Sequence, residues 1–290
     1  MEVIILGSPK EVEQMGGRIL ADQIARKPDS VLGLATGATM HGVYSYLSER
    51  HEKHGLDFSR VRSFNLDEYY GLGPHHPCSY HTYMCQHLFE RVNIQPGNTR
   101  VPDGLAHDVE AHCREYEQAI ESAGGIDLQL LGLGEDGHIG FNEPSSSLSS
   151  GMRIKTLTPM TRRSNQRDFP PGESMPMHVL TLGVGNIMAA RRCVLLAHGS
   201  KKAQAVQAMV EGPITAMCPA SMLQQHRNCT VVVDESAAAF LQLAEYFRCV
   251  YKHKPDWQKA GGAYGLRQVT GRPARFCRRP KARRSISPAR

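Results

Sequence analysis

Apolar residues along the chain fall into short runs separated by longer segments of helical spacing. The short runs predict strands because buried strands of an α/β protein read as continuous hydrophobic stretches; they lie at 3–6, 31–34, 61–65, 126–133, 179–184, 193–197 and 231–233. Apolar residues three or four positions apart predict helices at 10–26, from Thr39 through Leu47, and at 108–122, 203–211 and 235–250. This alternation favours an α/β fold, a doubly wound, mostly parallel sheet with helices on both faces in the Rossmann-like manner.

One stretch, Ile126 to Pro144, combines a strand with a concentration of ionisable groups. It reads IDLQLLGLGEDGHIGFNEP and places Asp136, His138 and Glu143 directly after the apolar run. Open α/β sheets carry their chemistry in glycine turns at the carboxyl ends of strands, so these side chains are candidates for acid–base work. The alternative is a hairpin turn whose charges face water, since turns attract Gly and Asp.

Gly132, Gly134 and Gly137 in that stretch satisfy the dinucleotide pattern G-x-G-x-x-G. The pattern also requires a following helix and an acidic residue roughly 20 positions on. Pro144 comes before a helix can run, and no Asp or Glu occurs between Pro144 and Gln166. We therefore expect no nicotinamide or flavin cofactor.

Two other strand ends have the composition of phosphate-binding turns. Thr36, Gly37, Ala38 and Thr39 follow the second strand, with Thr39 at the N-cap position of the next helix, and Gly199-Ser200-Lys201-Lys202 follow a later one. Backbone N–H groups at a helix start point toward an anion, and a lysine adds charge. Each segment could equally be an ordinary strand–helix turn.

Asp67 and Glu68 follow the third strand. They could be a general base and its neighbour, or a cap with helix-dipole partners. His75, His76, His81 and His87 come next at no convincing metal spacing, and the eight cysteines never form C-x-x-C. We read the cysteines as free thiols and expect no metal site. The whole pattern indicates a small phosphorylated substrate and acid–base chemistry.

Composition restricts the setting. The 290 residues are 41% hydrophobic, with no apolar run near the roughly 20 residues of a membrane span. The N-terminus, MEVIILGSPKEVEQ, reads as a strand and not as a signal peptide, so we expect a cytoplasmic protein without a membrane partner.

The net charge of +6 belongs to the C-terminus. Of 34 basic residues, nine follow Leu266, which leaves 25 against 28 acidic residues in the rest of the chain. We predict a catalytic domain over 1–253 and a disordered basic tail over 254–290. The tail could be an arm for nucleic acid or membrane surfaces, although Tyr264 and Phe276 are its only aromatics after Trp257, and we favour an extension without such a role.

Several runs in colinear order resemble the glucosamine-6-phosphate deaminase family, over roughly residues 1–250. They are LGLATGAT (32–39), SFNLDEYYGL (63–72), HPCSYHTYM (76–84), LGLGEDGHIGFNEPSSSL (131–148), RIKTLT (153–158), LTLGVG (180–185) and GSKKAQAVQAMVEGP (199–213). The 6-phosphogluconolactonases share the broader fold but are not expected to carry D-E-Y together with G-x-D-G-H-I-x-F-N-E-P.

The resemblance implies conversion of glucosamine 6-phosphate to fructose 6-phosphate and ammonia, in amino-sugar catabolism and without a cofactor. Asp67 matches the general base, His138 the ring-opening acid/base, and Asp136 and Glu143 the carboxylates that orient it. The substrate phosphate is implied to lie on Thr36, Gly37, Ala38 and Thr39, with Arg167 and Lys202 as cationic partners.

The family also includes homohexamers activated by N-acetylglucosamine 6-phosphate at subunit interfaces. Matching effector positions are Ser146, Arg153, Lys155, Thr156 and Tyr246. Alternating basic residues at 152–156 can hold a phosphate, or can simply protect a solvated edge strand. Departures from the family pattern are Ala38, Met40-His41 and the tail. A sugar-phosphate sensor without turnover is the rival reading, and a nucleic-acid-binding protein is a third.

Overall fold

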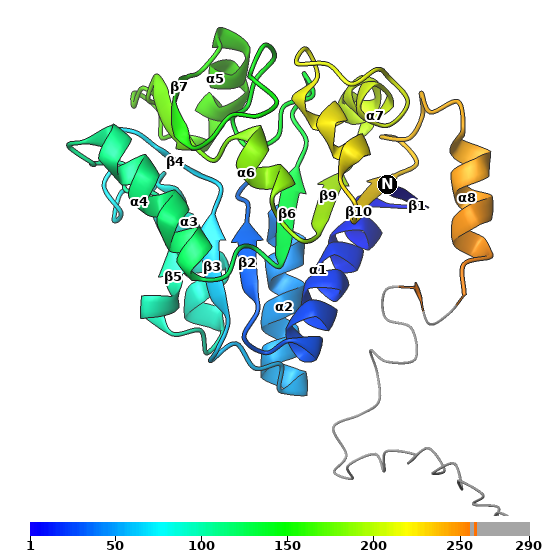
Figure 1. Ribbon diagram of the computed structural model, residues 1–290, viewed down its shortest axis with the longest axis horizontal. Coiled ribbons are helices and arrows are strands. Elements are labelled where there is room, and N and C mark those ends of the chain that lie inside the picture. The colour runs from blue at the N-terminus through cyan, green and yellow to red at the C-terminus, as the bar shows by residue number, and fades with distance from the viewer. Residues whose placement is uncertain (256–257, 260–290) are drawn as a thin grey trace, which may run out of the picture.

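A seven-stranded parallel sheet forms the centre of the computed structural model, which describes residues 1–255 and 258–259 (Figure 1). Its strands in spatial order are β1 (Glu2–Leu6), β10 (Cys229–Asp234), β9 (Cys193–Ala197), β6 (Leu128–Gly132), β2 (Val31–Leu34), β3 (Arg62–Asn65) and β5 (Thr99–Arg100). All six pairings are parallel, so every carboxyl end lies at one edge.

The strand order reverses direction between β2 and β6. From β2 the chain builds outward through β3 and β5, whereas from β6 it builds the other way through β9 and β10. Loops on the two sides of such a reversal separate and leave a crevice at the carboxyl edge. The predicted turn at 36–39 and the predicted stretch at 134–143 flank this point.

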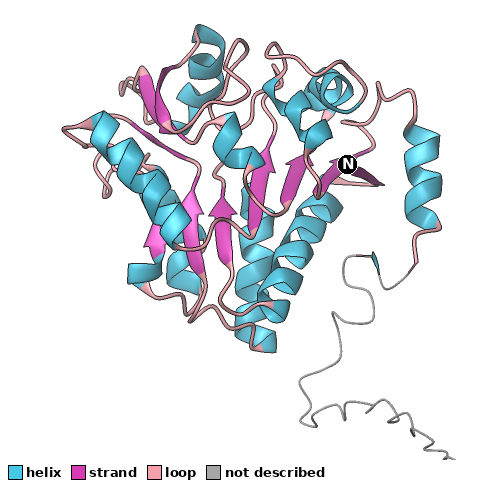
Figure 2. Ribbon diagram, viewed as in Figure 1, coloured by secondary structure: helices cyan, strands magenta, loops and turns pink. Residues whose placement is uncertain are grey.

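Helices cover both faces of the sheet, as the sequence predicted (Figure 2). The α-helices are α1 (Pro9–Arg26), α2 (Met40–His54), α3 (Tyr80–His87), α4 (Val109–Ser122), α5 (Pro159–Asn165), α6 (Val184–Met188), α7 (Ala203–Val210) and α8 (Ala244–Lys252). Short 3-10 helices are η1 (Phe89–Arg91), η2 (Pro96–Asn98), η3 (Gln166–Asp168), η4 (Ser200–Lys202) and η5 (Pro219–Gln225).

A second, antiparallel sheet lies beyond the carboxyl edge of the first (Figure 1). It has the order β4 (Asp67–Tyr69), β8 (His178–Thr181) and β7 (Arg153–Thr156). The strand predicted at 179–184 is therefore β8, four residues long and outside the parallel sheet. β4 and β7 supply its backbone partners, and an apolar run does not reveal which strands will pair with it. β7 is an edge strand, as predicted.

The predicted helix at 235–250 begins only at Ala244. Side chains of neighbouring elements hold the preceding residues in turns: the Asp234 carboxylate accepts from the Ala237 N–H, and the Glu211 carboxylate accepts from the N–H groups of Gln242 and Leu243. Such side-chain acceptors compete with helical hydrogen bonds, which an apolar period does not register.

Two hydrophobic cores follow this division. The larger surrounds the parallel sheet. The smaller lies under the antiparallel sheet and contains Tyr69, Phe141, Leu157, Phe169, Met175 and Val179. None of the helices in the described part is both long and apolar enough to cross a membrane.

Of the predicted tail at 254–290, only Lys254, Pro255, Gln258 and Lys259 are among the described residues. The Lys254 ammonium forms an ion pair with Glu2 at 2.5 Å and so joins this segment to β1. The remainder of the tail prediction lies outside the described residues.

Candidate active site

A cleft of about 750 Å³ opens at the carboxyl edge, where the strand order reverses. The ends of β2, β4, β6 and β9 line it, together with residues of α5 and η3. Among its lining residues are Asp67, Asp136 and His138, and also all six predicted phosphate residues, Thr36, Gly37, Ala38, Thr39, Arg167 and Lys202. Residues predicted from five separate sequence segments thus meet in one place.

Hydrogen bonds from two tyrosine hydroxyls fix the backbone of the turn after β2. Gly37 has φ +112°, a conformation that a side chain would strain. The Tyr83 hydroxyl donates to the Gly37 carbonyl at 2.8 Å, and the Tyr44 hydroxyl donates to the Ala35 carbonyl at 2.5 Å. Thr39 precedes α2 as predicted, but its hydroxyl makes no capping bond and instead lines the cleft.

Two cations lie on the opposite side of this turn. Burial lowers the pKa of Lys202, and although Glu135 and Asp136 counteract that effect, the positive charge of Arg167 adds to it. Arg167 is largely exposed and lies 3.8 Å from the Asp168 carboxylate. The end of the cleft between the turn and these side chains is therefore suited to a dianionic group.

Asp67 contributes a buried carboxylate that faces the cleft, with only 5% of its surface exposed. Burial, followed by the neighbouring charge of Glu68, raises its pKa to about 8. Within the described residues no hydrogen bond to its carboxylate oxygens is seen. A carboxylate that is desolvated and left without partners is a strong base for its type.

Glu68 points the other way and serves the fold. Its carboxylate accepts from the backbone N–H groups of Tyr69, Tyr80 and His81, the last two being the first residues of α3. Burial nevertheless raises its pKa to about 7. The sequence left open whether this pair supplies a base or caps a helix. Asp67 faces the cleft, where a base would act, and Glu68 caps the start of α3.

His138 and Asp136 form a hydrogen-bonded pair in the turn after β6. His138 Nδ1 lies 2.6 Å from Asp136 Oδ1, and the His138 N–H bonds to the same oxygen. Burial acts to raise the pKa of Asp136, but the bonds and charge of His138 outweigh it and the pKa is lowered. With Nδ1–H donated to the carboxylate, Nε2 is left as the basic nitrogen. The imidazole fits because Gly134 has no side chain; a Cβ there would lie 2.2 Å from Nδ1.

Glu143 does not contact this histidine through any hydrogen bond in the described residues. Its carboxylate accepts from the N–H and hydroxyl of Thr158 and from the Thr161 hydroxyl. It therefore joins the loop after β6 to the start of α5. Glu143 was expected to orient the imidazole. No hydrogen bond joins the two side chains in the described residues, because Thr158 and Thr161 at the start of α5 occupy the carboxylate oxygens.

Comparison with known proteins identifies the family. The family described as glucosamine-6-phosphate isomerases/6-phosphogluconolactonase matches residues 10–232, well over half of the chain. The chain belongs to this family of enzymes. A glucosamine-6-phosphate deaminase of Arthrobacter sp. (strain FB24) is 54% identical over 258 residues, which are 89% of this chain and 99% of the relative. One of Hahella chejuensis is 49% identical over 264 residues, 91% of this chain and 100% of the relative.

Solved structures agree with this assignment. A monomeric glucosamine-6-phosphate deaminase superposes with a TM-score of 0.81 at 44% identity, over 82% of this chain and 99% of that one. A 6-phosphogluconolactonase of Trypanosoma cruzi gives a TM-score of 0.68 at 21% identity, over 83% and 97% of the two chains, which shows the shared fold alone.

The residues that match the family's effector positions lie outside the cleft. Arg153, Lys155 and Thr156 are on β7, and Ser146 is buried nearby in sequence, with a hydroxyl that makes no hydrogen bond to any described residue. Tyr246 is exposed on α8, which packs against β1 at the other end of the parallel sheet from β7 (Figure 1). One chain alone does not bring the five together.

Sequence reasoning missed an aromatic wall and a histidine. Tyr69, Tyr80, Phe141 and Phe169 line the cleft, and the hydroxyls of Tyr69 and Tyr80 lie 3.0 Å apart. His198, immediately before the lysine turn, also lines it, and its Nε2 makes no hydrogen bond in the described part of the chain but lies 3.6 Å from Glu13 Oε1. Tyr69, Tyr80 and Phe141 occur within the motif runs at 63–72, 76–84 and 131–148, whereas nothing in the sequence distinguishes Phe169 or His198.

Proposed function

We propose that the chain is a glucosamine-6-phosphate deaminase, which converts glucosamine 6-phosphate and water to fructose 6-phosphate and ammonia. The observation that carries the proposal is the meeting of three functions in one cleft: a buried unpartnered carboxylate, an imidazole–carboxylate pair and a cationic end suited to phosphate. The relatives that bear this name are about half identical to the chain over nearly their whole length.

The phosphate would lie against Thr36–Thr39, Lys202 and Arg167, which sets the sugar's other end toward Asp67 and His138. The cyclic sugar has to open before C2 becomes acidic. His138 Nε2 takes the proton of the C1 hydroxyl and returns it to the ring oxygen, and Asp136 stabilises the imidazolium formed between these steps.

Asp67 then removes the hydrogen at C2, which the C1 aldehyde has made acidic, and delivers it to C1. This transfer, together with the movement of one amine proton to the C1 oxygen, turns the aminoaldehyde into a 2-imine with a C1 hydroxyl. Water then adds to the imine and displaces ammonia to leave the C2 ketone. A single carboxylate can perform both transfers on one face of the enediol-like intermediate. Because its pKa is about 8, the basic form of Asp67 grows as the pH rises toward and past that value.

The direct test uses the purified full chain with glucosamine 6-phosphate and measures ammonia and fructose 6-phosphate. We expect both in equal amounts, and no ammonia from glucose 6-phosphate, which lacks the amine. Hydrolysis of 6-phosphogluconolactone without deamination would instead assign the chain to the other branch of its family. Binding of glucosamine 6-phosphate without either product would favour a sugar-phosphate sensor.

We further propose that β7 holds the effector N-acetylglucosamine 6-phosphate. Arg153 and Lys155 can hold its phosphate, and the buried Ser146 hydroxyl has no hydrogen-bond partner within residues 1–255 and 258–259. Because Tyr246 lies at the far side of the chain, a complete site would require a second subunit, as in the predicted homohexamer; the 44% identical relative is described as monomeric. Arg153→Ala with Lys155→Ala should abolish activation but keep turnover at saturating substrate. Activation that survives would place the effector elsewhere.

The same resemblance predicts a role in amino-sugar catabolism, and we expect that role in the cytoplasm. It stays a prediction alongside the reaction itself.

A further inference from the structure

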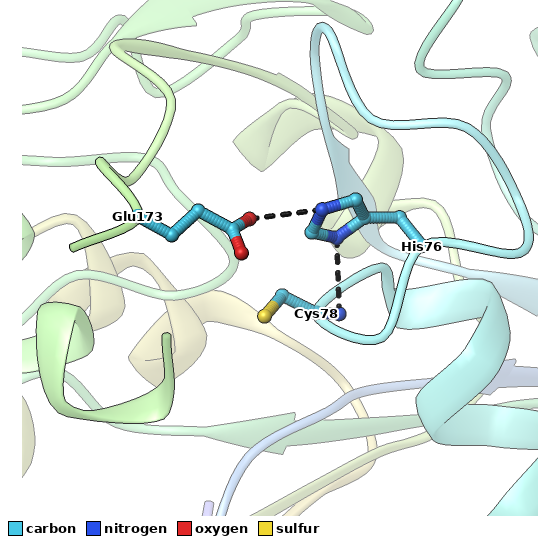
Figure 3. Close-up of side chains that lie close together, drawn as sticks. All are labelled: His76, Cys78 and Glu173. Carbon is cyan, nitrogen blue, oxygen red and sulfur yellow. Dashed lines mark hydrogen bonds and ion pairs between the residues drawn. The ribbon is translucent and has the colours of Figure 1, made fainter. Parts of the chain in front are cut away.

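Three side chains that can ligate a transition metal lie together at the mouth of the cleft (Figure 3). His76 and Cys78 come from the loop before α3, and Glu173 comes from the segment that follows η3. Their potential ligand atoms all lie within 4.8 Å of one another, and no other such group of three occurs in the part of the chain that is described. Segments nearly 100 residues apart in sequence therefore converge on one point.

Existing contacts already orient the imidazole and the carboxylate. The Cys78 backbone N–H donates to His76 Nδ1 at 3.1 Å, and His76 Nε2 lies 2.9 Å from Glu173 Oε1. The first bond directs Nε2 toward the carboxylate. Figure 3 shows the Cys78 sulfur on the same side as the carboxylate, below the line that joins it to the ring.

The charge around the thiol is negative. Burial, then the carboxylates of Glu173 and Asp168, raise the pKa of Cys78, so the sulfur is a protonated thiol beside two anions. Both His76 and Glu173 are partly exposed, with 28% and 35% of their side-chain surfaces accessible, so an ion can enter from solvent. A dication would neutralise the carboxylate and favour the thiolate.

We propose that His76, Cys78 and Glu173 form a binding site for a thiophilic divalent metal ion of the Zn²⁺ class. Nitrogen, sulfur and one carboxylate are the donor set that zinc prefers, whereas Mg²⁺ and Ca²⁺ prefer oxygen alone. Ligands around a tetrahedral zinc lie about 3.3–3.8 Å apart. The 2.9 Å between His76 Nε2 and Glu173 Oε1 therefore has to open slightly, whereas the Cys78 sulfur, within 4.8 Å of the other two ligand atoms, has to approach by up to roughly 1 Å, and water completes the fourth position.

Binding at this site releases one proton. The Cys78 thiol loses its proton to solvent, while the imidazole proton moves from Nε2 to Nδ1 so that Nε2 can ligate the ion. The Cys78 N–H then gives up its bond to Nδ1. The complex of dication, thiolate, neutral imidazole and carboxylate carries no net charge. Metal binding therefore neutralises the negative charge of the Glu173 carboxylate.

The site adjoins the proposed substrate site without being part of it. Cys78 lines the cleft, but His76 and Glu173 do not. A bound ion would join the loop before α3 to the segment that carries Arg167 and Asp168. The competing explanation is an ordinary His76–Glu173 ion pair with Cys78 as a bystander.

Cobalt(II) distinguishes these explanations because a thiolate ligand gives it a charge-transfer absorption in the near ultraviolet. We would titrate the metal-free full chain with Co²⁺ and expect the band to saturate at one equivalent and to disappear on addition of Zn²⁺. Cys78→Ser should remove the band. His76→Gln and Glu173→Gln should weaken Co²⁺ binding about tenfold or more, since even outer partners of metal ligands contribute that much.

Two cysteines provide matched controls. Cys85 lies 3.9 Å from His81 Nδ1, and Cys249 lies 3.6 Å from His253 Nδ1, each without a third ligand among the residues that the structure describes. Cys85→Ser and Cys249→Ser should leave the titration unchanged, and circular dichroism would establish that all variants are folded. A band that survives in Cys78→Ser, an unchanged affinity in Glu173→Gln, or no saturable band in the wild type would each overturn the proposal.

Discussion

At the residue scale, hydrogen-bond partners decide which of two adjacent buried carboxylates is reactive. Asp67 and Glu68 are both buried on β4, but Glu68 accepts three backbone N–H bonds whereas the Asp67 carboxylate has none among the described residues. The fold thus accommodates one charge with helix-terminal donors and leaves the other to the substrate. A buried carboxylate without partners is costly to ionise, which is the property that makes Asp67 basic.

The cost of ionising Asp67 predicts a pH-dependent stability change in Asp67→Asn. The folded pKa of about 8 lies above the ordinary aspartate value of 3.8, so between these values the folded state holds a proton that the unfolded chain has lost. Wild-type stability from this group therefore falls as the pH rises from about 4 to about 8 and then levels off. The asparagine is neutral throughout, so its stability relative to wild type should rise over that window.

Urea unfolding of both proteins at several pH values between 4 and 9 checks this sign. We expect Asp67→Asn to be more stable by on the order of 1–3 kcal/mol near pH 8, with little difference near pH 4. A difference in the free energy of unfolding that is constant from pH 4 to pH 9 would mean that burial does not shift the pKa of Asp67.

At the element scale, the turns at the carboxyl edge depend on contacts from helices that follow much later. The turn after β2 is held by Tyr83 of α3, whose hydroxyl donates to the Gly37 carbonyl. The loop after β6 is held through Glu143 by the start of α5. In each case the side chain supports a segment that we place in substrate binding or catalysis, without itself reacting.

Removal of the Tyr83 hydroxyl should loosen the proposed phosphate turn. Tyr83→Phe loses one hydrogen bond worth about 1 kcal/mol and retains the ring, so we expect KM for glucosamine 6-phosphate to rise about fivefold with kcat nearly unchanged. Tyr70→Phe is the matched control, because its hydroxyl lies 3.5 Å from the Ala106 carbonyl and away from the cleft. Equal effects of the two variants would argue against a positioning role for Tyr83.

Glu143→Gln tests the anchor between the loop after β6 and α5. The substitution replaces charge-assisted bonds to Thr158 and Thr161 by weaker ones and turns one amide N–H₂ toward donors, which should cost about 1.5–3 kcal/mol in the free energy of unfolding. Denaturant titration gives the value. Glu121→Gln, on the exposed face of α4, should change it by less than about 0.5 kcal/mol. A loss of activity at full stability would instead indicate a direct role for Glu143.

Sequence reasoning located the elements that depend on local pattern and missed those that depend on partners. The apolar runs at 31–34 and 193–197 became β2 and β9, and Thr39 directly precedes α2 as predicted, although its side chain makes no capping bond. The start of α8 and the sheet to which β8 belongs were not predictable, because Asp234, Glu211 and the strands beside β8 decide them. Likewise the hydrogen-bond partners of Glu143 come from a helix 15 residues later.

At the scale of the whole molecule, the reversal of strand order between β2 and β6 brings the candidate site together. On one side of this point β2, β3 and β5 follow one another in chain order, and on the other side β6, β9 and β10 do the same. The cleft opens between β2 and β6. The residues that line the cleft come from 35 to 202, so all of the cleft lies well before the basic C-terminal segment.

Deletion of residues 260–290 should therefore leave both folding and turnover intact. The hydrophobic cores and the Lys254–Glu2 ion pair precede the cut, so we expect the same midpoint of thermal unfolding and the same kcat and KM. Retention on immobilised DNA or RNA, compared before and after the deletion, tests the alternative arm. If the deletion lowers turnover, the segment contributes to catalysis. If the deletion lowers retention on nucleic acid, the segment is a nucleic-acid-binding arm.

The central claim is that Asp67 acts as the base that moves hydrogen from C2 to C1 of glucosamine 6-phosphate. The most direct measurement is ammonia release at pH 8 by the wild type and Asp67→Asn at saturating substrate, with substrate binding measured by calorimetry. We expect the variant to lose on the order of 10²-fold or more in rate while it binds the sugar phosphate within about threefold of wild type, because the phosphate turn and Lys202 are untouched. Turnover of Asp67→Asn at the wild-type rate would contradict the account.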